Sequence, residues 1–477
     1  MWRWPTSGTR RAAHPVAAIA RTGTRVFLVV GSADGRQELN GTRPAGRIGV
    51  GEPAPETWPE QVDVLIVGAG PAGSAAAITL ALAGRSVVIV DRAVFPRDKC
   101  CGDGLTTGAL RRLEHLGLDP ANVSSWEWVD DVMIAGANTK TIEFPLPTDG
   151  HFAAIATRLD LDAALVQLAR DAGARVIEGS TVTSAAQYRS EVHITMDSAH
   201  TISAQQVIAA DGMWSTVRRL LGPAAADVES DERATEGPPK HPTRYLGEWH
   251  AMRQYFSGVD NPNAKKLWVW FEKDLTPGYV WCFPLPGNRV NFGFGVERRA
   301  DTKTRTMKAS WESILQRPHI AAILGPNAVA EDTPKAWPIP ADPTTASFTD
   351  GRVLYVGDAA RVCDVLTGEG IGQALQTGIL AAEAILLFPN DFRASARQYE
   401  DDARAELVPD HRMASMLSKM LRSPVICNAA VAICGATNWT RKNFVRWLFE
   451  DYARGIALTP FRWRWGLMSG EGAYKNR

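Results

Sequence analysis

The residues best suited to chemistry are two adjacent thiols, Cys100 and Cys101, in a loop that is dense in glycine and cations. Arg97 and Lys99 come just before them, and positive charge beside a thiol changes how tightly it holds its proton. We therefore interpret Cys101 as a catalytic candidate that donates a proton or gates the site. A small residue that only packs is the alternative interpretation of this position.

A glycine fingerprint, Gly68-x-Gly70-x-x-Gly73, precedes this loop. The apolar, β-branched run at 62–67 predicts a buried parallel strand before it, and the alanine-rich stretch after it predicts a helix. In this arrangement the first glycine permits a tight turn, the second lets the backbone approach a pyrophosphate, and the third lets the helix pack closely. The next predicted strand ends at Asp91, near the spacing expected of a carboxylate that binds a ribose hydroxyl. These features predict a dinucleotide site.

Later elements favour FAD over a nicotinamide dinucleotide. One buried strand ends in the turn Asp211-Gly-x-x-Ser-x-x-Arg, another ends at Gly357-Asp358, and a long Ala/Leu helix begins near Gly368. Asp358 can accept hydrogen bonds from the ribityl chain of a flavin, and the helix N-terminus would favour the anion of reduced flavin. A carboxylate that only caps a helix is the alternative.

Aromatic residues predict the substrate side of the site. Residues 266–296 alternate with a period of two, which is typical of an antiparallel meander. One face of its second strand carries Tyr279, Trp281 and Phe283. A dry aromatic wall would keep water and oxygen from a reduced cofactor, whereas ordinary sheet core is the alternative. We include Phe292, on the third strand, among the predicted pocket residues.

The elements predict an α/β fold with a Rossmann-type FAD-binding domain, an antiparallel β substrate domain and a helical C-terminal segment. The FAD-binding domain is discontinuous, because a strand and helix of its type resume after the meander. We divide the chain into a disordered or targeting extension (1–60), the first part of the FAD-binding domain with inserted substrate-domain strands (61–240), the antiparallel substrate domain (241–345), the second part of the FAD-binding domain (346–395) and the helical C-terminal segment (396–477).

The composition is that of an ordinary globular protein, with 45% hydrophobic and 22% charged residues. A formal net charge of +0 gives no support to a nucleic-acid partner. The six cysteines have neither metal-ligand spacing nor the pattern of a secreted disulfide framework, so we expect no metal site and a reducing, cytoplasmic compartment. No apolar run reaches the ~18 residues of a membrane-spanning helix.

The C-terminal segment combines cations with tryptophan. Between Trp439 and Trp465 there are six Lys or Arg residues and only two acids. One predicted helical face carries four apolar residues: Phe444, Trp447, Leu448 and Tyr452. This pattern is typical of a segment that lies on a membrane surface, and a buried helical cap is the alternative.

Together the motifs resemble the geranylgeranyl reductase family, within the flavin-dependent hydroxylase-like superfamily, over roughly residues 61–390. The fingerprint with Asp91, the Asp211 turn and the Asp358 element carry the superfamily likeness. The stretches Phe95-Pro-Arg-Asp-Lys-x-Cys-Gly-Asp-Gly-Leu105 and Tyr279-x-Trp-x-Phe-Pro284 carry the family likeness.

By the same resemblance, Arg158 would contact FAD and Cys101 would lie beside the flavin. Two positions depart from the family pattern: Cys100 stands where Pro is frequent, and Asp364-Val365 stands where Asn-Pro is usual. The predicted catalytic residues are Cys101, Tyr279 and Trp281. The predicted cofactor contacts are Gly68, Gly70, Ala72, Gly73, Asp91, Arg92, Cys101, Gly102, Arg158, Asp211, Gly357, Asp358, Gly368, Gly370 and Ile371.

The resemblance implies a reductase that saturates C=C bonds of an isoprenoid chain, such as a geranylgeranyl group or the menaquinone side chain, by hydride transfer from reduced FAD. No second glycine fingerprint is visible, so either transiently bound NAD(P)H or a ferredoxin would supply the electrons. The substrate would be a prenyl lipid or prenyl-quinone, reached at a membrane surface. Two alternatives stay open: an FAD-dependent monooxygenase or halogenase, and a flavoprotein that passes electrons to a membrane quinone.

Overall fold

The computed structural model describes residues 58–138, 140–221, 247–298, 304–463 and 468–475, and the backbone of three short strands at 19–21, 26–28 and 233–235. The chain divides into two units, Met1–Pro53 and Ala54–Arg477. In the first unit β1 (Ile19–Arg21) pairs antiparallel with β2 (Val26–Leu28). The rest of the predicted extension, up to residue 57, lies outside the described residues.

The nucleotide half of the second unit is organised around the predicted fingerprint strand. β3 (Gln61–Val67) pairs parallel with β4 (Val87–Val90) on one side and with β13 (Thr201–Ala209) on the other. β10 (Arg175–Ile177) extends the parallel sheet beside β4, and β22 (Val353–Tyr355) extends it beside β13. Because β22 follows the meander in sequence, the FAD-binding domain is discontinuous, as predicted.

β13 also pairs with an antiparallel extension of the same sheet. The extension consists of β12 (Val192–Met196), β11 (Val182–Gln187) and β14 (Arg233–Thr235), while β21 (Thr349–Asp350) pairs with β22. A separate small sheet has the order β5 (Gly104–Thr106), β9 (Ala153–Ile155) and β6 (Glu127–Trp128). We call the loop that carries Cys100 and Cys101 the thiol loop. β5 follows it directly, so this small sheet fixes the end of the thiol loop.

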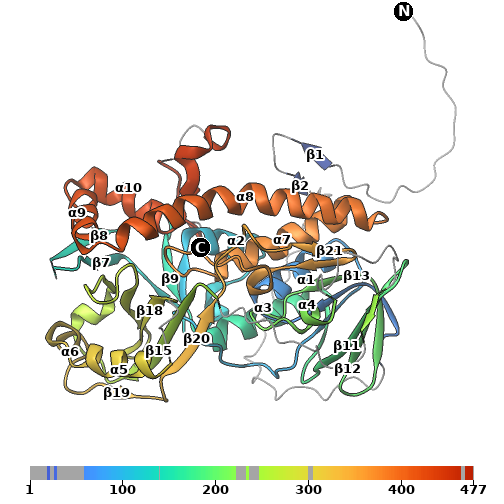
Figure 1. Cartoon of the computed structure of the whole chain (residues 1–477), viewed down its shortest axis with the longest axis horizontal. Helices are drawn as coiled ribbons and strands as arrows, with labels where there is room; N and C mark the ends of the chain where they lie inside the picture. Colours follow the sequence, from blue (N-terminus) through green and yellow to red (C-terminus); the bar gives the residue numbers. More distant parts are fainter. Residues whose placement is uncertain are drawn as a thin grey trace, which may run out of the picture. The chain divides into compact units, whose positions relative to one another are not determined.

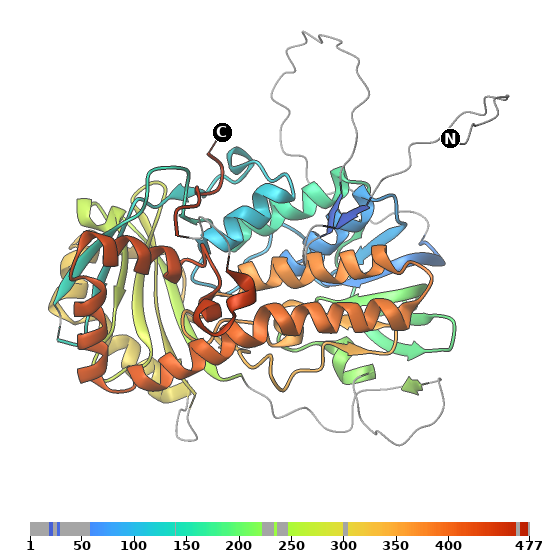
Figure 2. The same ribbon diagram turned by 90° about the horizontal axis from the view of Figure 1, so that it is seen from above.

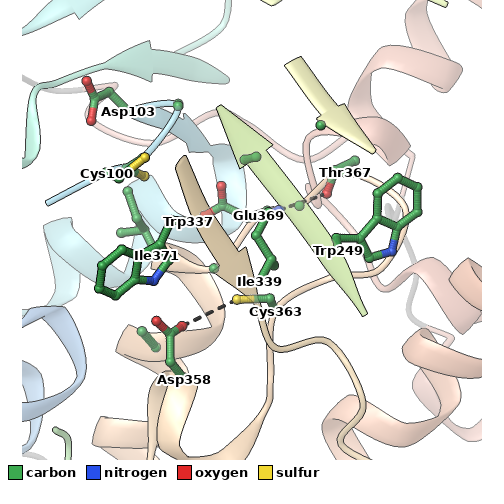
Figure 3. A pocket seen from close by; sticks show the side chains of 18 of the residues that line it. Cys100, Asp103, Trp249, Trp337, Ile339, Asp358, Cys363, Thr367, Glu369 and Ile371 are labelled. Carbon is green, nitrogen blue, oxygen red and sulfur yellow. Dashed lines mark hydrogen bonds between the residues drawn. The ribbon is translucent and has the colours of Figure 1, made fainter. Parts of the chain in front are cut away.

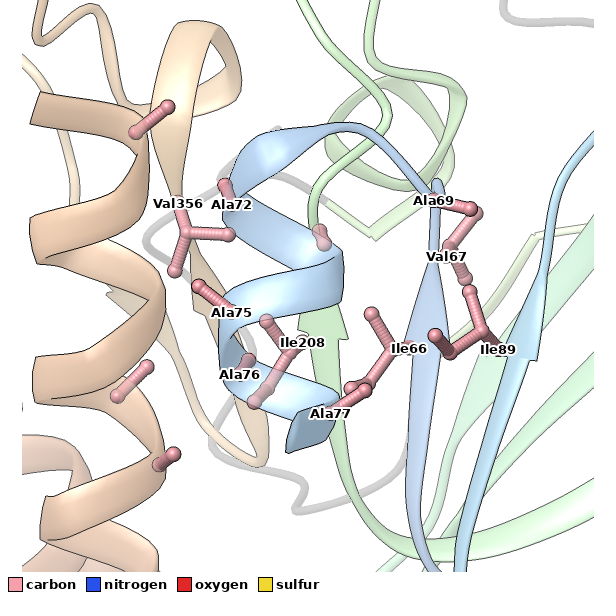
Figure 4. Packing of buried hydrophobic residues seen from close by; sticks show 14 of the residues in the cluster. Ile66, Val67, Ala69, Ala72, Ala75, Ala76, Ala77, Ile89, Ile208 and Val356 are labelled. Carbon is pink, nitrogen blue, oxygen red and sulfur yellow. The ribbon is translucent and has the colours of Figure 1, made fainter. Parts of the chain in front are cut away.

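Small residues let the helices of the nucleotide half pack closely. These helices are α1 (Pro71–Leu82), α2 (Thr107–His115), α3 (Arg158–Asp171), α4 (Thr216–Leu221) and α7 (Ile371–Leu387). Figure 4 shows the alanines of α1 between the sheet residues Ile66 and Ile208 and a neighbouring helix. A methyl group on Gly378 of α7 would lie 2.1 Å from the carbonyl oxygen of Ala72, so the two helices approach closely.

The substrate half is a second, mostly antiparallel sheet. Its central strands have the order β15 (Trp249–Ser257), β18 (Arg289–Glu297), β17 (Tyr279–Leu285) and β16 (Leu267–Trp270). β7 (Asp131–Ala135) joins β16 in parallel and pairs with β8 (Thr141–Pro145), while β19 (Val329–Ala330) and β20 (Lys335–Ile339) pair with β15. The meander matches the predicted one, but β15 was not predicted. Its buried polar residues Arg253 and Gln254 interrupt the alternation of apolar and polar residues by which a strand is predicted.

One face of this sheet is covered by helices α5 (Thr304–Leu315) and α6 (Pro318–Leu324). Trp311 of α5 packs on Phe292 and Phe294 of β18, with ring centroids 5.6 and 6.3 Å apart. The other face therefore remains available for the site.

Three C-terminal helices join the two halves. α8 (Phe392–Leu421) runs along α7 and extends to the end of the substrate sheet, where α9 (Pro424–Cys434) and α10 (Asn438–Leu448) lie near β7 and β8 (Figures 1 and 2). No single helix among the described residues is long and apolar enough to cross a membrane, although α8 and α9, bent by 117°, pass such a test together. The predicted α/β fold class is confirmed.

Candidate active site

One cavity of about 1190 Å³ connects the glycine fingerprint with the C-terminal helices. Its wall includes the thiol loop, one face of β17, the loop before α7 and the ends of α8, α9 and α10. Figure 3 shows part of the wall, with Cys100, Trp337, Glu369 and Asp358 around the space. The predicted site residues that line it are Gly68, Gly70, Ala72, Asp91, Arg92, Cys101, Gly102, Arg158, Asp211, Tyr279, Trp281, Phe283, Gly357, Asp358, Gly368, Gly370 and Ile371.

The fingerprint glycines have distinct geometries. Gly68 has a φ of +102°, and a methyl group there would meet the carbonyl oxygen of Ala210 at 2.3 Å. A methyl group on Gly73 would lie 1.9 Å from the carbonyl oxygen of Gly68, so Gly73 lies behind the cavity wall and packs the helix on the turn. Gly70 lines the cavity, and a methyl group there would find its nearest atom, in Arg97, at 3.6 Å. A ligand can therefore approach the backbone at Gly70.

Asp91 holds the turn that the fingerprint forms. Its carboxylate accepts hydrogen bonds from the backbone N–H of Ala69 at 2.7 Å and of Ala93 at 2.8 Å. These bonds fix Asp91 at the cavity wall, and each carboxylate oxygen keeps a lone pair for a ligand hydroxyl.

The residues present fit FAD. α1 begins at Gly70 without a side-chain cap, so its first backbone N–H groups remain available for a phosphate. Asp211 caps α4 with one carboxylate oxygen, which accepts from the N–H of Thr216 and Val217. Its other oxygen, Oδ1, is shielded from solvent and has no hydrogen-bond partner among the described residues. A buried acceptor without a donor at a cavity wall is what a polar cofactor group would satisfy.

Ion pairs position the other predicted cofactor contacts. Arg158, at the start of α3, forms two hydrogen bonds of 2.7 Å with Asp162, which also pairs with Arg97 at 2.8 Å. Lys99 donates to Asp358 at 2.8 Å. Burial by itself would raise the pKa of Asp358, but the charge and hydrogen bond of Lys99 hold it below its usual value. Asp358 therefore remains an anionic acceptor at the cavity.

The two thiols are protonated at neutral pH. Burial raises the pKa of Cys101 to about 11 and that of Cys100 to about 12. Arg253 lowers the pKa of Cys100 and Arg158 lowers that of Cys101, but burial outweighs both charges. Arg97 and Lys99 are themselves paired with carboxylates. Cys101 can thus act only as a protonated thiol, and the structure gives no support to a thiolate.

A buried polar network fixes the thiol loop on the aromatic face. Asn291 of β18 donates to the carbonyl oxygen of Cys101 at 2.9 Å and to Asp103 at 2.8 Å, and it accepts from the indole N–H of Trp281 at 3.0 Å. Tyr255 of β15 also donates to Asp103, at 2.6 Å. Burial raises the pKa of Asp103 to about 6, against the lowering effect of these hydrogen bonds.

The aromatic face of β17 lies directly against this loop. Methyl groups built on Gly102 and Gly104 would lie 3.5 and 3.3 Å from the ring of Phe283. Trp281 lies over Gly293 of β18, where a methyl group would overlap the indole at 2.3 Å. Tyr279 donates to the carbonyl oxygen of Thr367, in the loop before α7. The three predicted aromatics therefore line the cavity together.

The prediction that Phe292 lines the pocket is wrong. Phe292 pairs with Cys282 across the ladder, whereas Trp281 pairs with Gly293. Residues directly opposite each other share a face, so Phe292 lies on the far face, where it is fully buried against Trp311. The turn at 286–288 pairs Leu285 with Arg289 and could have fixed this register from the sequence.

An acidic cluster behind the loop before α7 was missed by the sequence reasoning. Asp364 accepts hydrogen bonds from the N–H groups of Leu366 and Thr367 and pairs with Arg454 at 2.9 Å. These contacts shape the loop at the position where the family pattern has Asn-Pro. Arg454 also pairs with Glu450 at 3.3 Å. Glu369 extends this cluster to the cavity wall.

The buried pair of Glu369 and Glu450 holds protons more tightly than free carboxyl groups do. Burial and the negative charge of Glu450 raise the pKa of Glu369 to about 8. Its Oε1 accepts from the N–H of Gly372 at 2.8 Å, in the first turn of α7. The cavity is therefore lined by a carboxylic acid that holds its proton but can release it more readily than the thiol of Cys101.

The other missed residues come from unpredicted elements. Arg253 of β15 lines the cavity, is fully buried and binds Asp98 at 2.6 Å. Trp337 of β20 lines the cavity with an indole N–H that has no partner among the described residues. No motif marks either residue. Asp103, in contrast, lies within the motif Phe95–Leu105, and Glu369 lies between the predicted cofactor contacts Gly368 and Gly370, so the sequence offered a signal for both.

The predicted membrane face of the C-terminal segment mostly turns inward. Phe444, Trp447 and Leu448 line the cavity, and Tyr452, beyond the end of α10, is buried. Trp465 lies outside the described residues. Trp439 and Trp463, at 66% and 63% exposure, face solvent.

The glycine cradle, the Asp358 loop and the shared cavity define an FAD-dependent oxidoreductase. The family model described as an FAD binding domain matches residues 61–397. A menaquinone reductase of Mycolicibacterium smegmatis is 32% identical over 350 residues, which are 68% of this chain and 76% of that protein. A digeranylgeranylglycerophospholipid reductase of Methanopyrus kandleri is 30% identical over 384 residues, 76% of this chain and 91% of that protein. The chain belongs to the FAD binding domain family. Within it, the chain belongs to the geranylgeranyl reductase family, which its motifs resemble.

Solved structures share the fold. A geranylgeranyl bacteriochlorophyll reductase-like protein of Thermoplasma acidophilum superimposes with a TM-score of 0.67 at 21% identity, over 85% of this chain and all of that one. A halogenase solved with FAD reaches a TM-score of 0.62 at 17% identity, over 83% and 86% of the two chains. The fold alone therefore does not separate a reductase from a halogenase.

Proposed function

We propose that this protein reduces C=C bonds in the polyprenyl chain of a membrane lipid or quinone. The observation that carries the proposal is the single cavity, which begins at the cofactor cradle and ends among apolar side chains of α8, α9 and α10. A long hydrocarbon chain could extend along this path with one double bond held next to the cofactor.

The relatives support this choice of substrate. They are named for menaquinone and for digeranylgeranylglycerophospholipid, and both names denote molecules of the membrane. All six cysteines are unpaired, which favours a reducing compartment. We therefore propose a cytoplasmic protein that works at the membrane surface.

The reaction needs a hydride on one carbon and a proton on the other. Bound reduced flavin would supply the hydride, and the chain must supply the proton. Glu369 is the better acid of the two candidates at the cavity wall, because its pKa is about 8 and that of Cys101 is about 11. We propose Glu369 as the proton donor and keep Cys101 as the residue that closes the cavity beside the cofactor.

The aromatic residues exclude water and orient the chain. Trp281 and Phe283 support the thiol loop, and Tyr279 fixes the loop before α7 through its bond to Thr367. A double bond held between these two loops would be screened from solvent, which protects the reduced cofactor from side reactions.

Anaerobic reoxidation tests the proposal. The FAD-loaded protein is photoreduced without oxygen and mixed with a menaquinone or a geranylgeranyl lipid, and the flavin spectrum and product mass are followed. We expect reoxidation together with a mass gain of two hydrogens for each bond reduced. The product is reoxidised in air before its mass is measured, because reduction of a quinone head group also adds two hydrogens and air removes them again. Flavin reoxidation without a mass gain that survives this step would contradict the proposal and favour a flavoprotein that passes electrons to the quinone head group.

A monooxygenase or halogenase predicts a different result. Such an enzyme would show no anaerobic reoxidation by the lipid and would release peroxide when reduced in air. The electron donor is resolved in the same assay, because NADPH and reduced ferredoxin can each replace light as the reductant.

A further inference from the structure

The outer face of α9 is apolar and exposed. Residues 423–440 contain no charged side chain. Exposed positions recur along the helix and just past its end: Val425, Ile426, Ala429, Ala432, Ile433 and Ala436. Val425 is 76% exposed and Ile433 is 68% exposed. A contiguous apolar face of this kind is uncommon on a surface that meets only water and marks a site of interaction.

Neighbouring elements enlarge this face. Met416 and Met420, near the end of α8, and Trp439, in the first turn of α10, are also exposed. We call these three residues and the exposed positions of α9 the apolar rim. Cations stand on both sides of it in sequence: Lys419 before α9, and Arg441 and Lys442 within α10. Arg422, also before α9, is paired with Glu297 and is not counted among them.

The cavity opens within the apolar rim. Met420 and Ile426 both line the cavity and are exposed, at 47% and 40%. Leu417, Ala430 and Cys434 continue the lining inward from these two residues. One mouth of the cavity therefore lies between the end of α8 and the start of α9, and its edge is apolar. Exposed lining residues such as Trp214 mark a separate opening at the cofactor end.

The inner side of α9 is firmly packed. Cys427 and Val431 are buried, and Asn428 accepts a hydrogen bond from the N–H of Asn138 at 3.0 Å, in the turn between β7 and β8. A methyl group on Gly435 would lie 2.4 Å from Ile142 of β8. The exposed side chains thus belong to a fixed surface and not to a loose segment.

We propose that the apolar rim docks the protein on an anionic lipid bilayer, with the cavity mouth facing the acyl chains. Three observations favour a bilayer over a second copy of this chain. The rim has cations at both of its ends, which suits anionic headgroups, and an exposed tryptophan, which suits the interface. It also surrounds the mouth, which a protein partner would cover. The role as an entry for substrate rests on the proposed function, whereas bilayer binding does not.

Vesicle flotation with the full-length FAD-loaded protein tests the inference. The double variant Val425→Glu/Ile433→Glu places two negative charges on the apolar rim. Neither substituted residue lines the cavity. The control Leu82→Glu/Val329→Glu adds the same charges at residues that are 70% and 62% exposed elsewhere. The probe is phosphatidylcholine vesicles with a minority of phosphatidylglycerol. We expect wild type and control to float and the rim variant to bind roughly tenfold more weakly.

A second measurement separates this inference from the proposed function. The rim variant should reduce a detergent-dispersed prenyl lipid at the wild-type rate and the same lipid in vesicles more slowly. If no lipid is reduced at all, the proposed function fails and flotation still decides on docking. Equal flotation of both double variants, or no flotation of wild type, would overturn the inference. Light scattering gives a further outcome that would overturn it. If the wild type were a dimer, the rim variant a monomer and neither bound vesicles, the apolar rim would be an interface between two copies of this chain.

Discussion

The cofactor end and the substrate end of the cavity are built in different ways. The cofactor end depends on short, contiguous motifs, such as the turn from Gly68 to Gly73, whose atoms have almost no room to move. The substrate end brings together β15, β17, the loop before α7 and the C-terminal helices, which are far apart in sequence. The difference suggests that changes at the cofactor end act in an all-or-none manner, while changes at the substrate end act in graded steps.

The largest effect is expected from Gly73→Ala. The new methyl group would overlap the carbonyl oxygen of Gly68, which is backbone and cannot rotate away. The turn must therefore open, which we expect to remove bound FAD and to lower the free energy of unfolding by about 3 kcal/mol. Flavin absorbance of the purified protein and chemical denaturation would measure the two effects.

Gly84→Ala is the matched control, at the far end of the same helix. Gly84 has a φ of +79° with no atom within 4 Å of the added methyl group. We expect a loss of about 1 kcal/mol from backbone strain alone, with FAD retained. If Gly73→Ala also kept its FAD, the all-or-none character of the cofactor end would be refuted.

A middle-sized effect is expected from Glu369→Gln. The variant keeps the shape of the side chain but has no acidic proton, so kcat should fall by about 10²-fold at pH 7. In wild type, activity should fall as pH rises through about 8, because Glu369 then loses its proton. The variant should lack this basic limb. Cys101→Ala, with FAD bound, should lose less activity; the reverse ranking would assign the proton to the thiol.

The same carboxyl group predicts how stability depends on pH. Its pKa is raised from 4.5 to about 8 on folding, so between these values the folded state holds a proton that the unfolded state has lost. The contribution of Glu369 to the free energy of unfolding should therefore be fully present below pH 4.5. It should decline as pH rises to about 8, by at most about 1.4 kcal/mol per pH unit. Glu369→Gln should flatten this decline, whereas Glu114→Gln, on the exposed side of α2, should not.

Contiguity explains which parts of the site could be predicted. The fingerprint, Asp91 and Asp358 each lie at the end of a strand within a short motif, so spacing alone predicts their place at one sheet edge. Arg253 lies on a strand whose polar residues hide its period, and Arg454 reaches Asp364 only because α8 carries the chain back across the molecule. Such contacts depend on tertiary packing that no local pattern records.

The smallest effect separates the two faces of the substrate sheet. Phe283 lies at the cavity and packs on glycines of the thiol loop, while Phe292, on the opposite face, is fully buried beside Trp311. Phe292→Leu should lower the free energy of unfolding by about 1 kcal/mol and leave KM for the lipid unchanged. Phe283→Leu should leave stability within about 0.5 kcal/mol and raise KM up to about tenfold.

The pair gives the register of β17 and β18 a functional test. Both substitutions replace phenylalanine with leucine on neighbouring strands, so the change in the side chain is the same. Only the face of the substrate sheet on which it occurs differs. If Phe292→Leu changed KM while Phe283→Leu did not, the ladder would be shifted by one residue, since a shift of that size moves every side chain to the other face. The graded character of the substrate end would then have to be derived from a different set of wall residues.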